Sequence, residues 1–297
     1  MRNGFKKWTI LAITAALSLS LILASGCGAG KPAGQSGAKK EVKLGYVNWA
    51  EGVAMTNLAK VVLEDKMGYS VKITMADVAP IFTSVANGDY DAFMDAWLPV
   101  THESYMKEYG AKLTDLGTNF EGARIGLVVP EYVSINSIEE MNGAKAKFDG
   151  KIIGIDSGAG IMKATDKAIK DYGLGFKLIP GSGPAMTAAL KDAVEKKEWV
   201  AVTGWKPHWK FARWKLKFLE DPKGIYGKVE NIHTVARKDI EKDLPEVAQF
   251  LRNFKLNDQQ LGSLMGLIAN SDDPLKSARK WVKDNEKLVD SWIPKKK

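Results

Sequence analysis

Two segments of this 297-residue chain carry the same landmarks in the same order. In each, an apolar run typical of a strand ends in a tryptophan, and a proline stops it two residues later. Strand ends are where open α/β sheets hold their ligands. Two long copies are too few for a solenoid, so the repeat predicts two related lobes with a ligand between them. The matched residues keep offsets of 104 to 109 positions: Gly45 with Gly154, Pro80 with Pro184, Trp97 with Trp205 and Pro99 with Pro207.

Each copy alternates strand-like and helical patterns in the order β-α-β-α-β. Such units favour an α/β fold in which each lobe is a mostly parallel sheet flanked by helices. Apolar runs at 123–130 and 229–236 follow the copies and are expected to cross between the lobes. A last amphipathic helix is predicted over 274–292, packed on the first lobe. The predicted strands are 42–47, 69–74 and the run into Trp97, then 151–156, 176–179 and 199–203.

The first 27 residues have the pattern of an export signal. Arg2, Lys6 and Lys7 are followed by an uncharged apolar run and then by small residues before Cys27. Cys27 is the only cysteine of the chain, and it stands where a bacterial lipoprotein signal places its lipidated residue. Ala24 departs from that pattern, in which leucine is usual three positions before the cysteine. The alternative is an uncleaved membrane-spanning anchor, because the run is near the minimum spanning length.

Either interpretation places the rest of the chain on the outer side of the membrane. Residues 28–40 are small and polar without periodicity, which is typical of a flexible tether. With one cysteine, the body has no internal disulfide and depends on its hydrophobic core. The formal net charge is +8, and it is +5 without the three basic residues of the signal. Nucleic-acid binding is one use of such a charge, but a solvated surface near anionic lipid fits an exported protein better.

The tryptophans at the two matched strand ends are candidate ligand contacts. Most tryptophans in folded proteins fill the core, so it is their placement that singles out Trp97 and Trp205. Trp49 follows the first predicted strand and is expected at the same edge of the sheet. Three indole rings at one crevice form a box that attracts a quaternary ammonium group by cation–π interactions. The alternative for Trp49 is a lid over its own lobe.

A second pattern favours an anion. Asp156-Ser-Gly-Ala-Gly160 is a glycine-rich turn that opens a helix, so the backbone N–H groups of Gly160 and Ile161 are available to a carboxylate. A tight turn that needs positive φ is the structural alternative. The turn is neither a Walker loop nor a full dinucleotide fingerprint. His102, five residues after Trp97, is a further candidate carboxylate contact, with a surface position as its alternative.

Catalytic and metal-binding patterns are weak. The chain has no Gly-x-Ser-x-Gly elbow and no His-Glu-x-x-His motif, and its three histidines are not clustered. We therefore expect no enzymatic activity, no metal and no cofactor. Two alternatives from other classes stay open: a secreted hydrolase that uses Asp91 or Asp95 with His102, and a nucleic-acid-binding module with stacking tryptophans.

Taken together, these motifs resemble the substrate-binding lipoproteins of glycine betaine/proline betaine ABC importers. The resemblance rests on Tyr46-Val-Asn-Trp49, Asp95-Ala-Trp97-Leu-Pro-Val-Thr-His102 and the stretches 154–162 and 203–209, within a similarity over about 42–293. It implies the two-lobed, hinge-closing fold of type II periplasmic binding proteins, with the ligand in the cleft between the lobes. It also implies that Trp49, Trp97 and Trp205 hold a trimethylammonium group. His102 and the backbone of Gly160 and Ile161 would hold the carboxylate of the same ligand.

The same interpretation divides the chain and suggests its partners. We expect a signal peptide in 1–27, a tether in 28–40, lobe 1 in 41–125 and 237–297, and lobe 2 in 126–236. The expected ligand is a zwitterionic quaternary ammonium compound, glycine betaine or proline betaine, with choline or carnitine as the alternative. The expected protein partner is an ABC permease with its ATPase, and no nucleic acid. The protein is expected to be a monomer, lipid-anchored to the cell membrane on its extracellular or periplasmic side, that serves osmoprotectant uptake.

Overall fold

Nine strands form one mixed sheet in residues 40–295, which are the residues that the computed structural model describes. The expected signal peptide with Cys27, and the tether as far as residue 39, lie outside the described residues. The strand order is β2-β1-β3-β9-β4-β7-β5-β6, and β8 pairs with β4. The strands are β1 (Glu41–Tyr46), β2 (Ser70–Met75), β3 (Ala92–Leu98), β4 (Leu113–Pro130), β5 (Lys151–Ile153), β6 (Lys177–Ile179), β7 (Val202–Lys206), β8 (Leu216–Phe218) and β9 (Glu230–Arg237).

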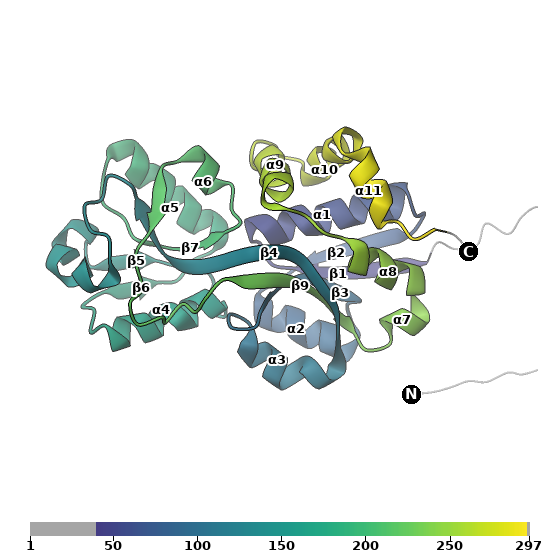
Figure 1. Cartoon of the computed structure of the whole chain (residues 1–297), viewed down its shortest axis with the longest axis horizontal. Coiled ribbons are helices and arrows are strands. Elements are labelled where there is room, and N and C mark those ends of the chain that lie inside the picture. The colour runs from purple at the N-terminus through teal and green to yellow at the C-terminus, as the bar shows by residue number, and fades with distance from the viewer. Residues whose placement is uncertain (1–39, 296–297) are drawn as a thin grey trace, which may run out of the picture. The chain divides into compact units, whose positions relative to one another are not determined.

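The long strand β4 is shared by two halves of this sheet. In the first half β1, β2 and β3 are parallel, and β9 pairs antiparallel with both β3 and β4. In the second half β5 is parallel to β6 and β7, and β4 is antiparallel to β7. β4 changes partner between Ala123, which pairs with β9, and Arg124, which pairs with β7. Figure 1 shows β4 running from one group of helices to the other.

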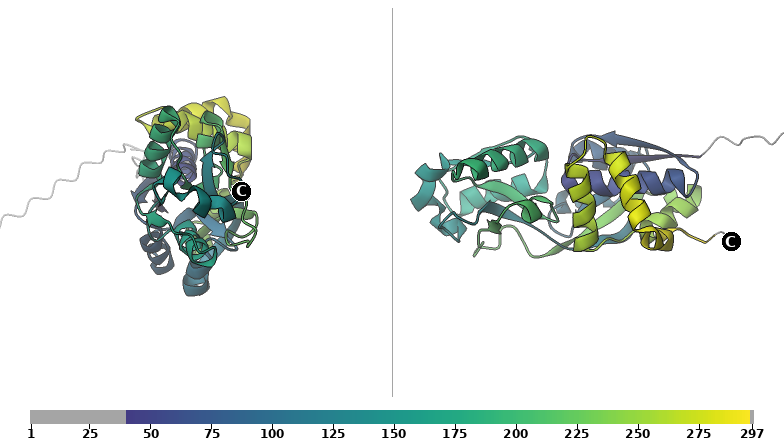
Figure 2. Two further views of the ribbon diagram at one scale, coloured as in Figure 1. Left: turned by 90° about the vertical axis from the view of Figure 1, so that its left-hand side faces the viewer. Right: turned by 90° about the horizontal axis from the view of Figure 1, so that it is seen from above.

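Helices cover both faces of each half, as the repeated β-α-β-α-β order predicts (Figures 1 and 2). None of the helices described is long and apolar enough to cross a membrane. The α-helices are α1 (Ala50–Asp65), α2 (Val78–Asn87), α3 (Glu103–Tyr109), α4 (Gly160–Asp171), α5 (Gly183–Lys196), α6 (Lys210–Arg213), α7 (Ile240–Asp243), α8 (Pro245–Asn253), α9 (Asp258–Ala269), α10 (Pro274–Asp284) and α11 (Glu286–Trp292), and 3₁₀ turns span Gly110–Lys112 and Ile138–Phe148.

The C-terminal helices pack on α1 of the first half, as expected, but the single helix predicted over 274–292 is wrong. The chain leaves helical geometry at Asn285, between α10 and α11. The Asn285 side-chain amide donates to the Trp281 carbonyl at 2.9 Å, which satisfies an open end of α10. The bend brings the rings of Trp281 and Trp292 into a stack, with centroids 6.5 Å apart. Tertiary packing therefore overrides the continuous amphipathic pattern.

The two matched tryptophans occupy equivalent places in the sheet. Trp97 is the last residue but one of β3, and Trp205 is the last but one of β7. Each strand ends before a proline that follows a cis peptide bond, Leu98–Pro99 in one copy and Lys206–Pro207 in the other. The predicted strand 199–203 is corrected by three residues at each end, because β7 runs from Val202 to Lys206. Both indoles are thus fixed to a strand backbone rather than to a loop.

Asp91 joins three strands at the end of the sheet away from these tryptophans. Its carboxylate accepts from the backbone N–H of Lys43 in β1 and from Arg237 Nε in β9, both at 2.7 Å. The Asp91 and Arg237 side chains are largely buried, and Arg237 also donates to Asp243 at 2.7 Å. Six residues of strand separate Asp91 from Trp97, which is a distance of about 20 Å.

Replacing Asp91 with asparagine should therefore affect stability and leave ligand binding intact. The substitution removes a largely buried charge that Arg237 and a backbone donor both use, so we expect the free energy of unfolding to fall by about 2 kcal/mol. Urea unfolding measures this loss, and calorimetric titration of a ligand measures binding at the Trp97 end. A stable variant that has lost binding would contradict a purely structural role for Asp91.

Candidate functional site

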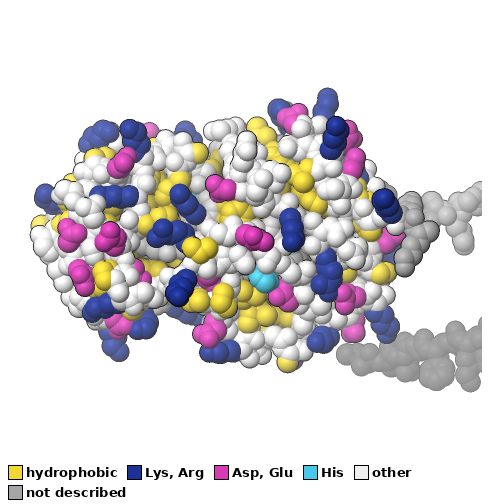
Figure 3. Space-filling model, in the orientation of Figure 1, with side chains coloured by type: hydrophobic (Ala, Val, Ile, Leu, Met, Phe, Trp, Pro, Cys, Tyr) yellow, Lys and Arg dark blue, Asp and Glu magenta, His cyan; other side chains and the backbone are white. Residues whose placement is uncertain are grey.

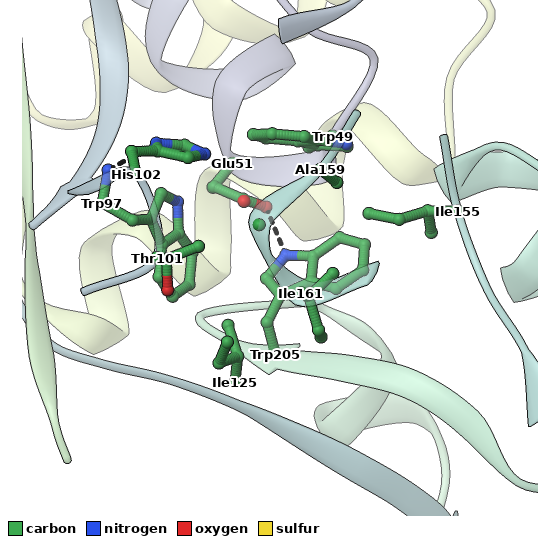
Figure 4. A pocket seen from close by; sticks show the side chains of 11 residues that line it. Trp49, Glu51, Trp97, Thr101, His102, Ile125, Ile155, Ala159, Ile161 and Trp205 are labelled. Atoms are coloured by element: carbon green, nitrogen blue, oxygen red, sulfur yellow. Dashed lines mark hydrogen bonds between the residues drawn. The ribbon is translucent and has the colours of Figure 1, made fainter. Parts of the chain in front are cut away.

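One cavity between the two halves of the sheet contains all six ligand contacts proposed from the sequence (Figure 4). The space between its wall atoms, open solvent included, is about 280 Å³. Both halves contribute to its wall, and apolar and aromatic side chains predominate. The lining residues are Trp49, Glu51, Trp97, Thr101 and His102 from the first half, Ile125 from β4, and Ile155, Ala159, Gly160, Ile161 and Trp205 from the second.

Each of the three cavity tryptophans donates its indole N–H to a carboxylate. Trp97 Nε1 donates to Asp95 at 2.8 Å within strand β3. The other two bonds join the halves. Trp205 Nε1 donates to Glu51 at 2.8 Å, and Trp49 Nε1 donates to Asp156 at 3.0 Å. These bonds fix each ring in one orientation, and all three rings are at least 95% buried.

Two buried carboxyl groups, those of Glu51 and Asp95, accept hydrogen bonds at the aromatic end of the cavity. Glu51 and Asp95 are both 1% exposed. Burial raises the pKa of Asp95 to about 7, and the hydrogen bond from Trp97 opposes that shift. Burial, followed by repulsion from Asp95, raises the pKa of Glu51 well above its usual range, whereas Trp205 and Lys210 act in the opposite direction. A bound cation would favour the ionised form of both groups.

A buried lysine lies against one of the same rings. Lys210 Nζ is 4.1 Å from the centroid of the Trp205 ring, and the residue is fully buried. Its ammonium group has no hydrogen-bond partner among the described residues. Burial lowers the pKa of Lys210 to about 7, and attraction to Glu51 partly offsets this shift. Lys210 does not line the cavity, so it covers part of Trp205 that the cavity does not reach.

The other end of the cavity is suited to an anion. Helix α4 begins at Gly160, so the backbone N–H groups of Gly160 and Ile161 have no acceptor within the helix, whereas that of Met162 bonds the Ala159 carbonyl. These donors and the positive end of the helix dipole attract negative charge. A Cβ at position 160 would overlap the carbonyl oxygen of Thr101, so only glycine allows the two halves to approach this closely here.

His102 is set up as a hydrogen-bond donor toward this cavity. Its Nδ1 accepts the backbone N–H of Trp97 at 2.9 Å. Burial lowers the pKa of His102 to about 3, with the nearby Lys163 as a second cause, so the ring is neutral at pH 7. A neutral imidazole that accepts at Nδ1 carries its proton on Nε2. Nε2 is buried and has no partner among the described residues, and the ring stacks on Trp49 at 5.8 Å (Figure 4).

Further contacts hold the halves together around the cavity. Tyr105 donates its hydroxyl to the carbonyl of Gly158 at 2.9 Å. Lys163 Nζ donates to Ser104 at 3.1 Å and lies 4.8 Å from the Tyr105 ring centroid. With the bonds of Trp49 and Trp205, these contacts describe a closed arrangement of the two halves.

The alternative sites considered from the sequence find little support in the geometry. Asp91 is far from the cavity, and Asp95 does not line it, so neither carboxylate faces His102 across a cavity. His208 is buried beside Trp205, with ring centroids 5.0 Å apart, but also lies outside this cavity. No cluster of three or more His, Cys, Asp or Glu side chains suited to a metal occurs in residues 40–295. Lysines and acids are interspersed on the face shown in Figure 3, without a basic stripe.

Sequence reasoning missed the partners of the rings. Glu51 and Asp156 were not proposed, although Glu51 stands two residues after Trp49 and Asp156 opens the glycine-rich turn. Asp95 was considered only as a catalytic residue of a possible hydrolase. A buried indole N–H needs an acceptor, so the presence of three tryptophans was a signal to search for three acceptors.

Comparison with known proteins identifies the family. Residues 40–284 match the model of the substrate-binding domain of ABC-type glycine betaine transport systems, and the chain belongs to this family. A curated relative is the glycine betaine/carnitine transport binding protein GbuC of Listeria monocytogenes, 45% identical over 144 residues. That similarity spans about half of each protein, 48% of this chain and 48% of the relative.

Two solved structures extend the similarity across the fold. Lactococcal OpuAC, in a closed conformation complexed with glycine betaine, is 39% identical, with 86% of this chain and 100% of that chain covered and a TM-score of 0.82. The glycine betaine/L-proline-binding protein ProX of Borrelia burgdorferi is 38% identical, with 86% and 97% covered and a TM-score of 0.83. The predicted α/β fold, with two lobes and a ligand cleft between them, is confirmed.

The buried state of His102 predicts a pH-dependent stability. The unfolded chain binds a proton at His102 below about pH 6.5, whereas the folded chain, with a His102 pKa of about 3, does not. Because the unfolded state binds more protons in this window, the contribution of His102 falls as the pH falls below 6.5. Between pH 7 and pH 5 the loss is about 2 kcal/mol.

Urea unfolding of the wild type and of His102→Gln isolates this effect. The stability difference between the two proteins should shift by about 2 kcal/mol in favour of the variant between pH 7 and pH 5. Asp95 has the opposite trend, because its raised pKa favours the folded state at lower pH. Since both proteins contain Asp95, its contribution cancels when the two free energies of unfolding are subtracted. A difference that stays constant with pH would show that His102 is protonated equally in both states.

Proposed function

We propose that this protein captures glycine betaine, or proline betaine, outside the cell and delivers it to an ABC permease and its ATPase for osmoprotectant uptake. The observation that carries this proposal is a single cavity with three carboxylate-anchored indoles at one end and the first turn of α4 at the other. A betaine is a zwitterion and needs both environments at once. Membership of a glycine betaine-binding family supports the same assignment.

The proposed contacts divide by charge. Trp49, Trp97 and Trp205 surround the trimethylammonium group, and each desolvated face contributes about 0.5–2 kcal/mol. His102 Nε2–H and the backbone N–H groups of Gly160 and Ile161 hold the carboxylate. This is a binding site and not an active site, because the ligand is transferred unchanged. The related proteins named above are likewise described as binding proteins.

Choline or carnitine is the second candidate ligand. The Listeria relative is described as binding glycine betaine and carnitine, and both compounds carry the quaternary ammonium group that an aromatic box selects. Choline lacks a carboxylate and would leave the His102 and α4 donors unused. The anion-binding end of the cavity therefore favours a betaine or carnitine over choline.

We further propose the lobe division and the anchoring suggested by the sequence. Lobe 1 contains 41–125 and 237–297 and lobe 2 contains 126–236, with one adjustment. Because β9 pairs with β3 of the first half, the point where the chain returns from lobe 2 to lobe 1 is better placed just before Glu230. A signal peptide in 1–27, lipidation of Cys27 and a tether as far as residue 40 would hold a monomer at the outer surface of the membrane.

Calorimetry with glycine betaine tests the assignment directly. The wild type should bind, and Trp205→Ala should bind at least about tenfold more weakly, because one desolvated indole face is worth roughly 1–2 kcal/mol. Trp199→Ala is the matched control, since Trp199 packs on Phe148 and Lys147 away from the cavity and should leave affinity unchanged.

A panel of ligands completes this experiment. Proline betaine, choline, carnitine and proline are titrated alongside glycine betaine, with tryptophan fluorescence as a second signal. His102→Gln should weaken glycine betaine more than choline, which has no carboxylate to lose. The absence of heat and of fluorescence change with every quaternary ammonium compound would overturn the proposed function.

Cys27→Ala tests the anchor on the full-length chain expressed in a bacterium. Removal of the lipidated residue should move the protein from the membrane fraction to the soluble fraction, because the remaining anchor is lost. Affinity for glycine betaine should not change. Retention of the variant in membranes would favour an uncleaved apolar segment instead.

A further inference from the structure

The turn 98–102 presents two cavity residues, Thr101 and His102, and lies against the start of α4. It connects β3 to α3 and is closed by the backbone bond from the His102 N–H to the Trp97 carbonyl at 3.0 Å. The Thr101 carbonyl lies against Gly160, and Val100 lies 3.3 Å from where a Cβ would stand on Gly227. The turn is therefore pressed against the second half at two points.

The buried carboxylate of Glu230 accepts hydrogen bonds from this turn. Glu230 Oε1 accepts the backbone N–H of Val100 at 2.6 Å and that of Thr101 at 2.9 Å. Glu230 Oε2 accepts the Thr101 hydroxyl. Glu230 is 2% exposed, and no lysine or arginine among the described residues forms an ion pair with it. All of its hydrogen bonds are thus directed to the turn, which is the arrangement that makes a buried charge tolerable.

Glu230 also occupies a particular place in the sheet. It is the first residue of β9, and it pairs with Ala123 of β4. The next residue of β4, Arg124, pairs with Lys206 in the second half. Glu230 therefore stands at the point where the chain passes between the halves, and its side chain reaches the turn that faces the ligand.

We propose that Glu230 is a positioning residue that fixes the 98–102 turn to the crossing strand and so presets His102 for the carboxylate of the ligand. The inference rests on the proposed function for the identity of that ligand. The proposal predicts different effects at the two ends of the cavity. Trp97 is held by the β3–β9 ladder, opposite Ile232, and does not depend on Glu230. Loss of Glu230 should weaken binding of the ligand's carboxylate and leave binding of its ammonium group to the aromatic box unchanged.

Calorimetry with two probes measures this separation. In Glu230→Ala, glycine betaine should bind at least about tenfold more weakly, whereas choline, which lacks the carboxylate, should change by less than about threefold. Glu230→Gln should recover most of the glycine betaine affinity, because its amide oxygen can still accept both backbone N–H groups. Glu121→Ala is the matched control, since Glu121 is exposed on the neighbouring strand β4 and should leave both affinities unchanged.

Hydrogen exchange tests the positioning without any ligand. The amides of Val100 and Thr101 should exchange at least about tenfold faster in Glu230→Ala than in the wild type, and those of Ala92 to Ala96 in β3 should not change. If Glu230→Ala does not fold, Glu230→Asp, which keeps the charge but shortens its reach, should show the same selective effects. Unchanged exchange, or equal losses for both probes, would overturn the inference. A wild type that binds neither probe would overturn the proposed function, and the exchange result would still decide the role of Glu230.

Discussion

The hydrogen bonds between three indole N–H groups and three carboxylates determine most of this site. An indole buried in an apolar cavity must find an acceptor, and a carboxylate is the strongest one available. Asp95, Glu51 and Asp156 meet this need for Trp97, Trp205 and Trp49. The same carboxylates are themselves poorly solvated, which is why the pKa of each is raised. Of the three, only Glu51 lines the cavity, and a cation bound there would favour its ionised form.

Two of these bonds make the box a property of both halves together. Trp205 reaches Glu51, and Trp49 reaches Asp156, across the boundary between the halves. If the halves move apart, both indoles lose their acceptors and the third wall of the box is removed. In the proposed binding mode, a cation that binds the closed form more tightly than the open form shifts the equilibrium toward closure by that difference in affinity. The overlap that any side chain at position 160 would cause adds a steric condition for closure at the anionic end.

The sequence predicted those parts of the molecule that depend on local pattern. Strand runs, prolines and glycines located both sheet halves, and the matched strand ends led to Trp97 and Trp205, which the structure places in one cavity with Trp49. The parts that it did not predict are contacts between distant residues. Glu51 is 154 positions from Trp205, Asp156 is 107 from Trp49, and Glu230 is 129 from Thr101. An acidic residue in the first turn of a helix is so common that Glu51 gave no separate signal. The break at Asn285 was missed because amphipathic periodicity continues through it.

Lys210 shows which kind of cation such a box can hold. Its ammonium group lies on the Trp205 ring, near Glu51, but its N–H donors have no partner among the described residues. A primary amine escapes this cost by releasing its proton, and the pKa of Lys210 is accordingly lowered to about 7. A quaternary ammonium group has no N–H to satisfy and no proton to release. It keeps its charge in an apolar cavity at little hydrogen-bonding cost, whereas an ordinary amine must either lose its charge or leave its donors unpaired. The proposed aromatic box therefore favours quaternary over primary ammonium groups.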